Sequence, residues 1–149
     1  MAVIREDRDA AFWNRIANDP DVIGTLFGQP PEAVGFHMAD PRVRHFSTER
    51  GGWAFVRLDS FGLIWDTHAM FTPDGWGREA NAVLKHALRS MFEDAHMFVV
   101  TETDNPRSRP PLSFGFRSTG GVSDTFVGPV RTWALTRAAW ASSPACRRA

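Results

Sequence analysis

The sequence has no tyrosine, one cysteine and no net charge. Because Cys146 has no second thiol in the chain, an intramolecular disulfide and a zinc cluster of several thiolates are both excluded. The 17 basic residues balance 17 acidic ones, so charge gives no reason to expect nucleic acid or an anionic membrane as a partner. The absence of tyrosine removes a common proton donor from any mechanism.

Long hydrophobic runs are also absent. No segment approaches the roughly 18 apolar residues of a membrane-spanning helix, and the first residues lack the pattern of a signal peptide. We therefore expect a cytoplasmic protein without a membrane partner. His37, His45 and His96 show no metal-ligand spacing, so we expect no metal site. The length and composition predict a single domain over residues 1–141, followed by a flexible tail over 142–149.

The hydrophobic pattern predicts helices at the start of the chain and strands in its middle. One helix is expected after an N-cap at Asp7 or Asp9, and another should open at Pro31. Three strand-like segments follow, separated by the turns ERGG and SFG, a spacing that favours an antiparallel meander. These segments are residues 43–48, 53–59 and 63–72, and residues 3–5 predict a further short strand.

The helical period is clearest after residue 77, where apolar residues recur at i, i+3, i+4 and i+7. They are Ala80, Val83, Leu84, Ala87, Leu88, Met91 and Phe92. A buried strand over 96–103, a short helix that ends at Gly115, and two strands over 118–126 and 131–137 complete the order. This order predicts an α/β (α+β) fold with a mixed, mainly antiparallel central sheet flanked by helices.

The change from strand to helix falls on the glycine pair Gly75 and Gly77. The first turn of a helix leaves N–H groups without partners, and glycine lets an anion approach them, so a phosphate is the natural ligand. The alternative is that the pair only makes a tight turn. A Walker A loop is excluded because no Gly-Lys-Ser/Thr follows, and the spacing of a dinucleotide fingerprint is missing.

Several segments occur in an order that resembles the GNAT superfamily of acetyl-CoA-dependent N-acyltransferases. They are FTPDGWGREA with the amphipathic helix after it, VVTETDNPRS, FGFRSTGG and WALTRAAW. The resemblance covers about Val43 to Trp140 and is particularly similar to the short GNAT-like proteins of tailed phages and prophages. It implies acetyl-CoA as acyl donor and an amine acceptor, on a small molecule or a protein. A homodimer is left open.

The resemblance also implies which residues bind the cofactor. The pyrophosphate would lie on the amides of Gly75, Trp76, Gly77 and Arg78, and the pantetheine arm along Ala69, Met70 and Phe71, with Asn105 nearby. The sequence departs from the family in two ways. Its loop is shorter than the usual Arg/Gln-x-x-Gly-x-Gly/Ala and carries Asp74 and Glu79 near the expected phosphate. It also lacks the tyrosine that the family often uses as general acid.

Candidate catalytic residues precede the glycine pair. Strand alternation places Asp66 and His68 on one face, where they could relay a proton from the acceptor amine, with His68 as the base near neutral pH. The alternative is a histidine with a structural role at the end of a strand. The leading hypothesis is therefore an N-acyltransferase that uses direct attack in a ternary complex. The alternatives are a non-catalytic GNAT-like structural or head-assembly protein of a phage, and modification of a nucleobase amine, which the neutral charge disfavours.

Overall fold

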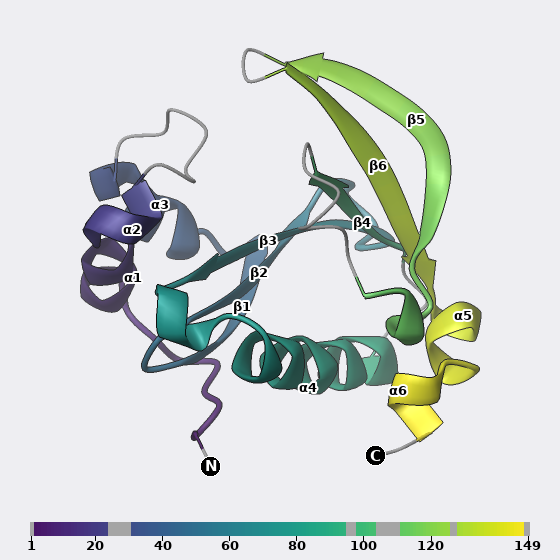
Figure 1. Cartoon of the computed structure of the whole chain (residues 1–149), viewed down its shortest axis with the longest axis horizontal. Helices are drawn as coiled ribbons and strands as arrows, with labels where there is room; N and C mark the ends of the chain where they lie inside the picture. The colour runs from purple at the N-terminus through teal and green to yellow at the C-terminus, as the bar shows by residue number, and fades with distance from the viewer. Residues whose placement is uncertain (1, 24–30, 95–97, 104–110, 126–127, 148–149) are drawn as a thin grey trace. The chain divides into compact units, whose positions relative to one another are not determined.

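The computed structural model describes residues 2–23, 31–94, 98–103, 111–125 and 128–147 (Figure 1). It divides into two compact units. The first unit consists of Met1–Val56 and His68–Ala87, and the second of Arg57–Thr67 and Leu88–Ala149. Strand β3 (Ile64–Phe71) and helix α4 (Arg78–Asp94) each belong partly to one unit and partly to the other. The domain boundary expected after residue 141 stays a prediction.

The sheet of the first unit has the strand order β1-β2-β3. Strands β1 (Val43–Thr48) and β2 (Gly51–Arg57) pair antiparallel from Val43 opposite Val56 to Thr48 opposite Gly51. Their two-residue turn is therefore Glu49 and Arg50. Strand β1 has the predicted bounds, whereas β2 begins two residues earlier than predicted. Of the strand predicted at residues 3–5, only an isolated bridge between Arg5 and Ser47 forms.

The helices α1 (Ala10–Ala17), α2 (Pro20–Ile23) and α3 (Pro31–Met38) also belong to the first unit. Asp9 is the N-cap of α1, because its side chain accepts a hydrogen bond of 2.9 Å from the Phe12 N–H. Helix α3 opens at Pro31 as predicted, and it lies beside α1 in Figure 1. Buried Phe12, Trp13 and Ile16 form part of the core between these elements.

Helix α4 follows the predicted period. All seven apolar residues predicted for its buried face are at most 3% exposed, which confirms the assignment. In the first unit, the indole Nε1 of Trp53 on β2 donates a hydrogen bond of 2.8 Å to the carbonyl of Ala80. This bond attaches the first turn of α4 to the sheet. A short 3₁₀ turn, η1 (Pro73–Gly75), lies between β3 and α4.

The second unit contains a sheet in the order β3-β4-β6-β5. Strand β4 (Phe98–Thr103) is parallel to the start of β3, with Ile64 opposite Phe98, and antiparallel to β6 (Gly128–Thr136). Strand β5 (Arg117–Thr125) pairs antiparallel with β6 and forms the long curved ribbon of Figure 1, with an irregularity between Ser118 and Val122. One parallel pair among antiparallel ones confirms the predicted mixed sheet.

Short helical elements complete the second unit. The 3₁₀ turn η3 (Leu112–Phe114) ends at Gly115, which has φ +100°, as predicted for the short helix. Helix α5 (Arg137–Ala141) follows β6, and α6 (Pro144–Arg147) lies where a flexible tail was predicted. The Ser143 hydroxyl accepts a hydrogen bond from the Cys146 N–H, which makes Ser143 the cap of α6. No helix in the described ranges is long and apolar enough to cross a membrane.

Candidate functional site

The segment that joins β3 to α4 is held against the β1–β2 turn within the first unit. The Thr72 N–H donates a hydrogen bond of 2.8 Å to the carbonyl of Arg50. The Gly75 N–H then donates a bond of 2.9 Å back to the carbonyl of Thr72 and closes the 3₁₀ turn. The loop before the helix therefore has a defined backbone path. The amide of Gly75, one of the four predicted to face the pyrophosphate, already has an acceptor in the loop.

Gly75 is a glycine because there is no room for a side chain. It is buried, and a Cβ atom added there would lie 2.9 Å from both Cβ of Arg50 and Cδ1 of Phe71. Such contacts force neighbouring atoms to move. The role of Gly75 is therefore to pack the turn.

Gly77 has a different reason to be glycine. Its φ is +82°, in the left-handed region, and a Cβ atom added there would meet nothing within 4 Å. The first backbone bond of α4 runs from the Asn81 N–H to the Gly77 carbonyl, at 2.9 Å. In the described part of the chain the amides from Trp76 to Ala80 have no acceptor. Open space and unused N–H donors thus coincide at Gly77, as anion binding requires.

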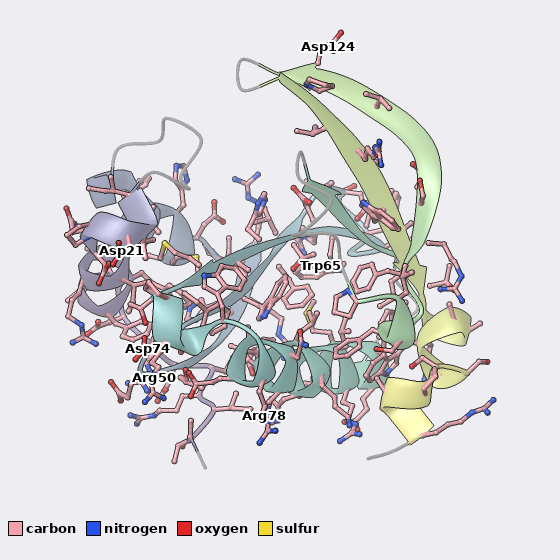
Figure 2. All side chains as sticks on the ribbon, viewed as in Figure 1. Asp21, Arg50, Trp65, Asp74, Arg78 and Asp124 are labelled. Atoms are coloured by element: carbon pink, nitrogen blue, oxygen red, sulfur yellow. The ribbon has the colours of Figure 1, made fainter. Side chains whose placement is uncertain are left out.

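The two acidic residues of the loop are bound by Arg50. Its Nε donates to Oδ2 of Asp74 at 2.9 Å, and its Nη1 donates to Oε1 of Glu79 at 3.0 Å. The Thr72 hydroxyl adds a bond of 2.6 Å to the other oxygen of Asp74. Figure 2 shows Arg50 and Asp74 close together.

The electrostatic effect of these contacts is visible in the pKa values of the loop. The hydrogen bond from Thr72, followed by the one from Arg50, lowers the pKa of Asp74 below its usual value. The hydrogen bond to Asp74 and the charge of Glu79 raise the pKa of Arg50. Asp74 is therefore held in its charged form, and because Arg50 binds both Asp74 and Glu79, the two carboxylates oppose an incoming phosphate less than the sequence alone implies.

Trp76 and Arg78 carry the exposed side chains of this site. Trp76 is 48% exposed, and its ring centroid lies 5.2 Å from that of Phe71. Arg78 is exposed at the start of α4 and has no acidic partner among the described residues, in contrast to Arg50. In Figure 2 Arg78 lies apart from the neighbouring pair Arg50 and Asp74. Arg78 is thus a cation that remains available to a ligand.

The predicted pantetheine segment lies at the end of β3. Ala69 is half-buried, whereas Met70 and Phe71 are only 8% and 2% exposed. A ligand along this segment would therefore meet backbone atoms more than side chains. Asn105, predicted to lie near the same arm, is outside the described residues.

The two candidate catalytic residues alternate along β3 around Thr67. His68 is exposed and Asp66 is half-buried, whereas Thr67 is 2% exposed, a pattern that fits one face for Asp66 and His68 and the other for Thr67. Each of the three residues takes part in a noncovalent interaction. The boundary between the two units follows Thr67, so Asp66 belongs to the second unit and His68 to the first.

Sequence reasoning missed Arg50 and Thr72, the two residues that hold Asp74. Arg50 is 24 residues from Asp74 in the chain, so no local motif could reveal the pair. In the residues that the structure describes, no group of three His, Cys, Asp or Glu side chains is placed to hold a metal ion.

Comparison with known proteins found no matching family model and no matching curated protein. Solved structures do match. An aminoglycoside 6'-acetyltransferase type Ii superposes with a TM-score of 0.71 at 12% identity, over 91% of this chain and 97% of that one. A Vibrio cholerae spermidine N-acetyltransferase in complex with CoA and spermine gives 0.70 at 15% identity, over 93% and 96%.

A third structure, an aminoglycoside 6'-N-acetyltransferase complexed with coenzyme A, has a TM-score of 0.70 at 11% identity and covers 91% of this chain and 97% of its own. All three cover nearly the whole of both chains. At these identities the likeness concerns the fold. The chain therefore has the fold of N-acetyltransferases, which confirms the fold that the GNAT resemblance implied.

Proposed function

We propose that the protein is an acyl-CoA-dependent N-acyltransferase, most simply one that transfers an acetyl group from acetyl-CoA to an amine in a ternary complex. The observation that carries the proposal is the open space over Gly77, at φ +82°, beside amides that have no acceptor among the described residues. Two solved N-acetyltransferases of the same fold contain CoA, which supports the assignment of that space to CoA.

The proposed cofactor contacts follow from the loop. The amides of Trp76, Gly77 and Arg78 would bind the pyrophosphate, and the Arg78 guanidinium would add a positive charge. The amide of Gly75 would contribute less, because it already donates to Thr72. Ala69, Met70 and Phe71 would hold the pantetheine arm through their backbone, and Asn105 remains in the proposal as a further contact to that arm.

The chemistry needs a neutral amine and aligned reactants. Acetyl-CoA supplies an acyl thioester from which an amine displaces the CoA thiolate. In this proposal His68 accepts the proton that the amine nitrogen loses as its bond to the acyl carbon forms, and Asp66, two residues earlier on β3, is the second member of the proton relay. No tyrosine is present to protonate the departing thiolate, so the protein would leave that proton to solvent or to a residue outside this site.

The acceptor is proposed to be an amine on a small molecule or a protein. The solved neighbours include a spermidine N-acetyltransferase and aminoglycoside acetyltransferases, so polyamines and aminoglycosides are the first acceptors to assay. The narrower relation to phage proteins and the cytoplasmic location remain predictions.

Isothermal titration with acetyl-CoA and with CoA tests the cofactor assignment, and an assay of free thiol release with a panel of amines tests transfer. We expect saturable binding of acetyl-CoA with one site per chain, and thiol release that depends on both acetyl-CoA and an amine. An absence of heat and of thermal stabilisation at millimolar acetyl-CoA would reject the proposal and favour a non-catalytic scaffold. Binding without transfer to any amine would retain the cofactor site but reject the enzymatic function.

A further inference from the structure

A cavity of about 590 Å³ that is wide open to solvent lies in the first unit, where the start of α1 meets the β1–β2 turn. Its wall includes Arg8, Phe12, Arg15 and Glu49, and it contains none of the residues proposed to bind CoA. The volume is within the range of about 300 to 1,000 Å³ that small-molecule sites occupy. The charges on its wall indicate which ligand it would take.

Two guanidinium groups are held over one aromatic ring in this wall. The central carbon of Arg8 lies 4.8 Å from the ring centroid of Phe12, and that of Arg15 lies 5.3 Å from the same centroid. Phe12 is itself 6% exposed and fixed in the core. The Arg8 side chain is only 12% exposed, so its guanidinium has a defined position before any ligand arrives. Cation–π contacts of this kind orient a guanidinium without neutralising it.

The negative charge that faces these two guanidinium groups comes from a single carboxylate, that of Glu49, and its position is less firmly fixed than theirs. Glu49 accepts a bond of 2.9 Å from Nη2 of Arg8, and its other oxygen lies 3.8 Å from Nη2 of Arg15. One carboxylate therefore serves two guanidiniums. The Glu49 side chain is 73% exposed, and ion pairs of such exposed groups contribute little.

The other two carboxylates of the wall already have partners. Asp7 lies 3.3 Å from Nε of Arg5, and Asp9 accepts the Phe12 N–H as the helix cap. In addition, Nε of Arg8 is buried and has no acceptor among the described residues, so Glu49 satisfies only part of this guanidinium. The wall as a whole holds three arginines and three carboxylates, but Arg8 and Arg15 share Glu49 as their one acidic partner among the described residues.

We propose that this cavity binds a small organic anion whose carboxylate or phosphate group contacts Arg8 and Arg15 and displaces Glu49. Arginine suits this role because its planar fork matches both kinds of group. The arginines are positioned by Phe12, whereas Glu49 can rotate into solvent. Glu49 therefore acts as an internal counter-ion that a ligand replaces.

The test measures anion binding by isothermal titration at low ionic strength with the full chain. The probes are glutarate for a carboxylate and glycerol 3-phosphate for a phosphate, with sodium chloride at matched ionic strength as reference. We expect Glu49→Gln to bind the preferred probe about two- to fivefold more tightly than the parent, because the internal competitor is gone. The probe that binds more tightly shows whether the site prefers a carboxylate or a phosphate.

Two further variants make the result specific. Asp40→Asn changes the net charge as Glu49→Gln does and frees Arg42, an exposed arginine whose Nη2 lies 2.8 Å from Asp40. We expect no gain in anion binding from it. Arg15→Gln, at a side chain that is 65% exposed, should abolish binding in the Glu49→Gln background. Equal gains from Glu49→Gln and Asp40→Asn, full binding after Arg15→Gln, or no binding of either probe would each overturn the proposal.

Discussion

The Nε of Arg50 donates a hydrogen bond of 2.9 Å to Oδ2 of Asp74, across the gap between the β1–β2 turn and the loop before α4. A second nitrogen of the same guanidinium binds Glu79 at 3.0 Å. One cation thus offsets half of the formal negative charge that Asp74 and Glu79 place beside Gly77. The same contacts join the loop to the sheet, so the position of the candidate phosphate site depends on Arg50.

Replacing Arg50 tests this dependence. We expect Arg50→Gln to weaken CoA binding roughly fivefold, because two unpaired carboxylates then repel the phosphates, with a larger effect at low salt. Titration calorimetry at two salt concentrations measures it. Adding Glu79→Gln to the same variant should restore part of the affinity, whereas Arg42→Gln is the matched control and should change nothing. If Arg50→Gln binds CoA as tightly as the parent at both salt concentrations, the charge of the loop does not influence cofactor binding.

Gly77 can be probed without straining the backbone. Asparagine tolerates the left-handed region better than other residues with a side chain, so Gly77→Asn should fold while its side chain fills the open space. We expect CoA affinity to fall tenfold or more, which corresponds to a loss of about 1.4 kcal/mol of binding free energy, with little change in Tm.

Gly120 supplies the matched control for this variant. It has φ +78° and also no atom within 4 Å of an added Cβ, but it lies on β5 in the second unit. Gly120→Asn should therefore change Tm by a similar small amount and leave CoA affinity intact. If both variants bind CoA as the parent does, the space over Gly77 does not serve the cofactor.

For a substitution at Gly75 we expect the opposite result, a large loss of stability and a smaller loss of CoA affinity. A methyl group at this position would lie 2.9 Å from Arg50 and Phe71, so Gly75→Ala should lower the free energy of unfolding by about 1–3 kcal/mol. Urea denaturation measures the change. CoA affinity per folded molecule should fall less than in Gly77→Asn. Parental stability of Gly75→Ala would mean that the turn relaxes more easily than its packing indicates.

The buried His45 should make the folded protein less stable in mild acid. It is 9% exposed on β1, and burial lowers its pKa below the usual 6.5, although Glu6 and Asp7 oppose this shift. The unfolded chain therefore binds a proton more readily than the folded one, so the contribution of His45 to stability is complete above pH 6.5 and declines as the pH falls below it.

Melting temperatures between pH 7.5 and 5.5 measure this decline. His45→Gln should flatten the profile, whatever its effect at pH 7.5, because the protonation step is gone. His37→Gln, at an exposed histidine, is the control and should retain the parental slope. Identical slopes in all three proteins would mean that His45 does not control the acid sensitivity.

His68 distinguishes catalysis from a structural role. If it removes the amine proton, His68→Gln should lower kcat roughly 100-fold at pH 7 with a smaller change in KM for acetyl-CoA. The activity should recover as the pH rises, because more of the amine is then already neutral. A structural histidine would instead lower Tm and leave kcat in the folded protein near the parental value.

The sequence predicted best where a periodic pattern decides burial. The α4 stripe from Ala80 to Phe92 and the bounds of β1 follow directly from apolar spacing. It did not predict helix α6, although Ser143 followed by Pro144 is a helix-start signal, because the segment is short and polar.

In the candidate site, the sequence could not separate Gly75 from Gly77. One is required by packing and the other by a positive φ, and both properties arise from the tertiary path of the loop. The pairing of Arg50 with Asp74 was equally hidden, because it joins segments distant in the chain. Local patterns therefore located the loop but not the interactions that decide its charge.

The two-residue turn between β1 and β2 constrains insertions in an unusual way. Surface turns generally tolerate added residues, because few contacts depend on their length. Here the adjacent residues Glu49 and Arg50 make ion pairs with different partners, Glu49 with Arg8 and Arg50 with Asp74. A single inserted residue would move one of these side chains away from its partner. Homologous chains that keep both clusters should therefore keep the length of this turn, even where its sequence varies.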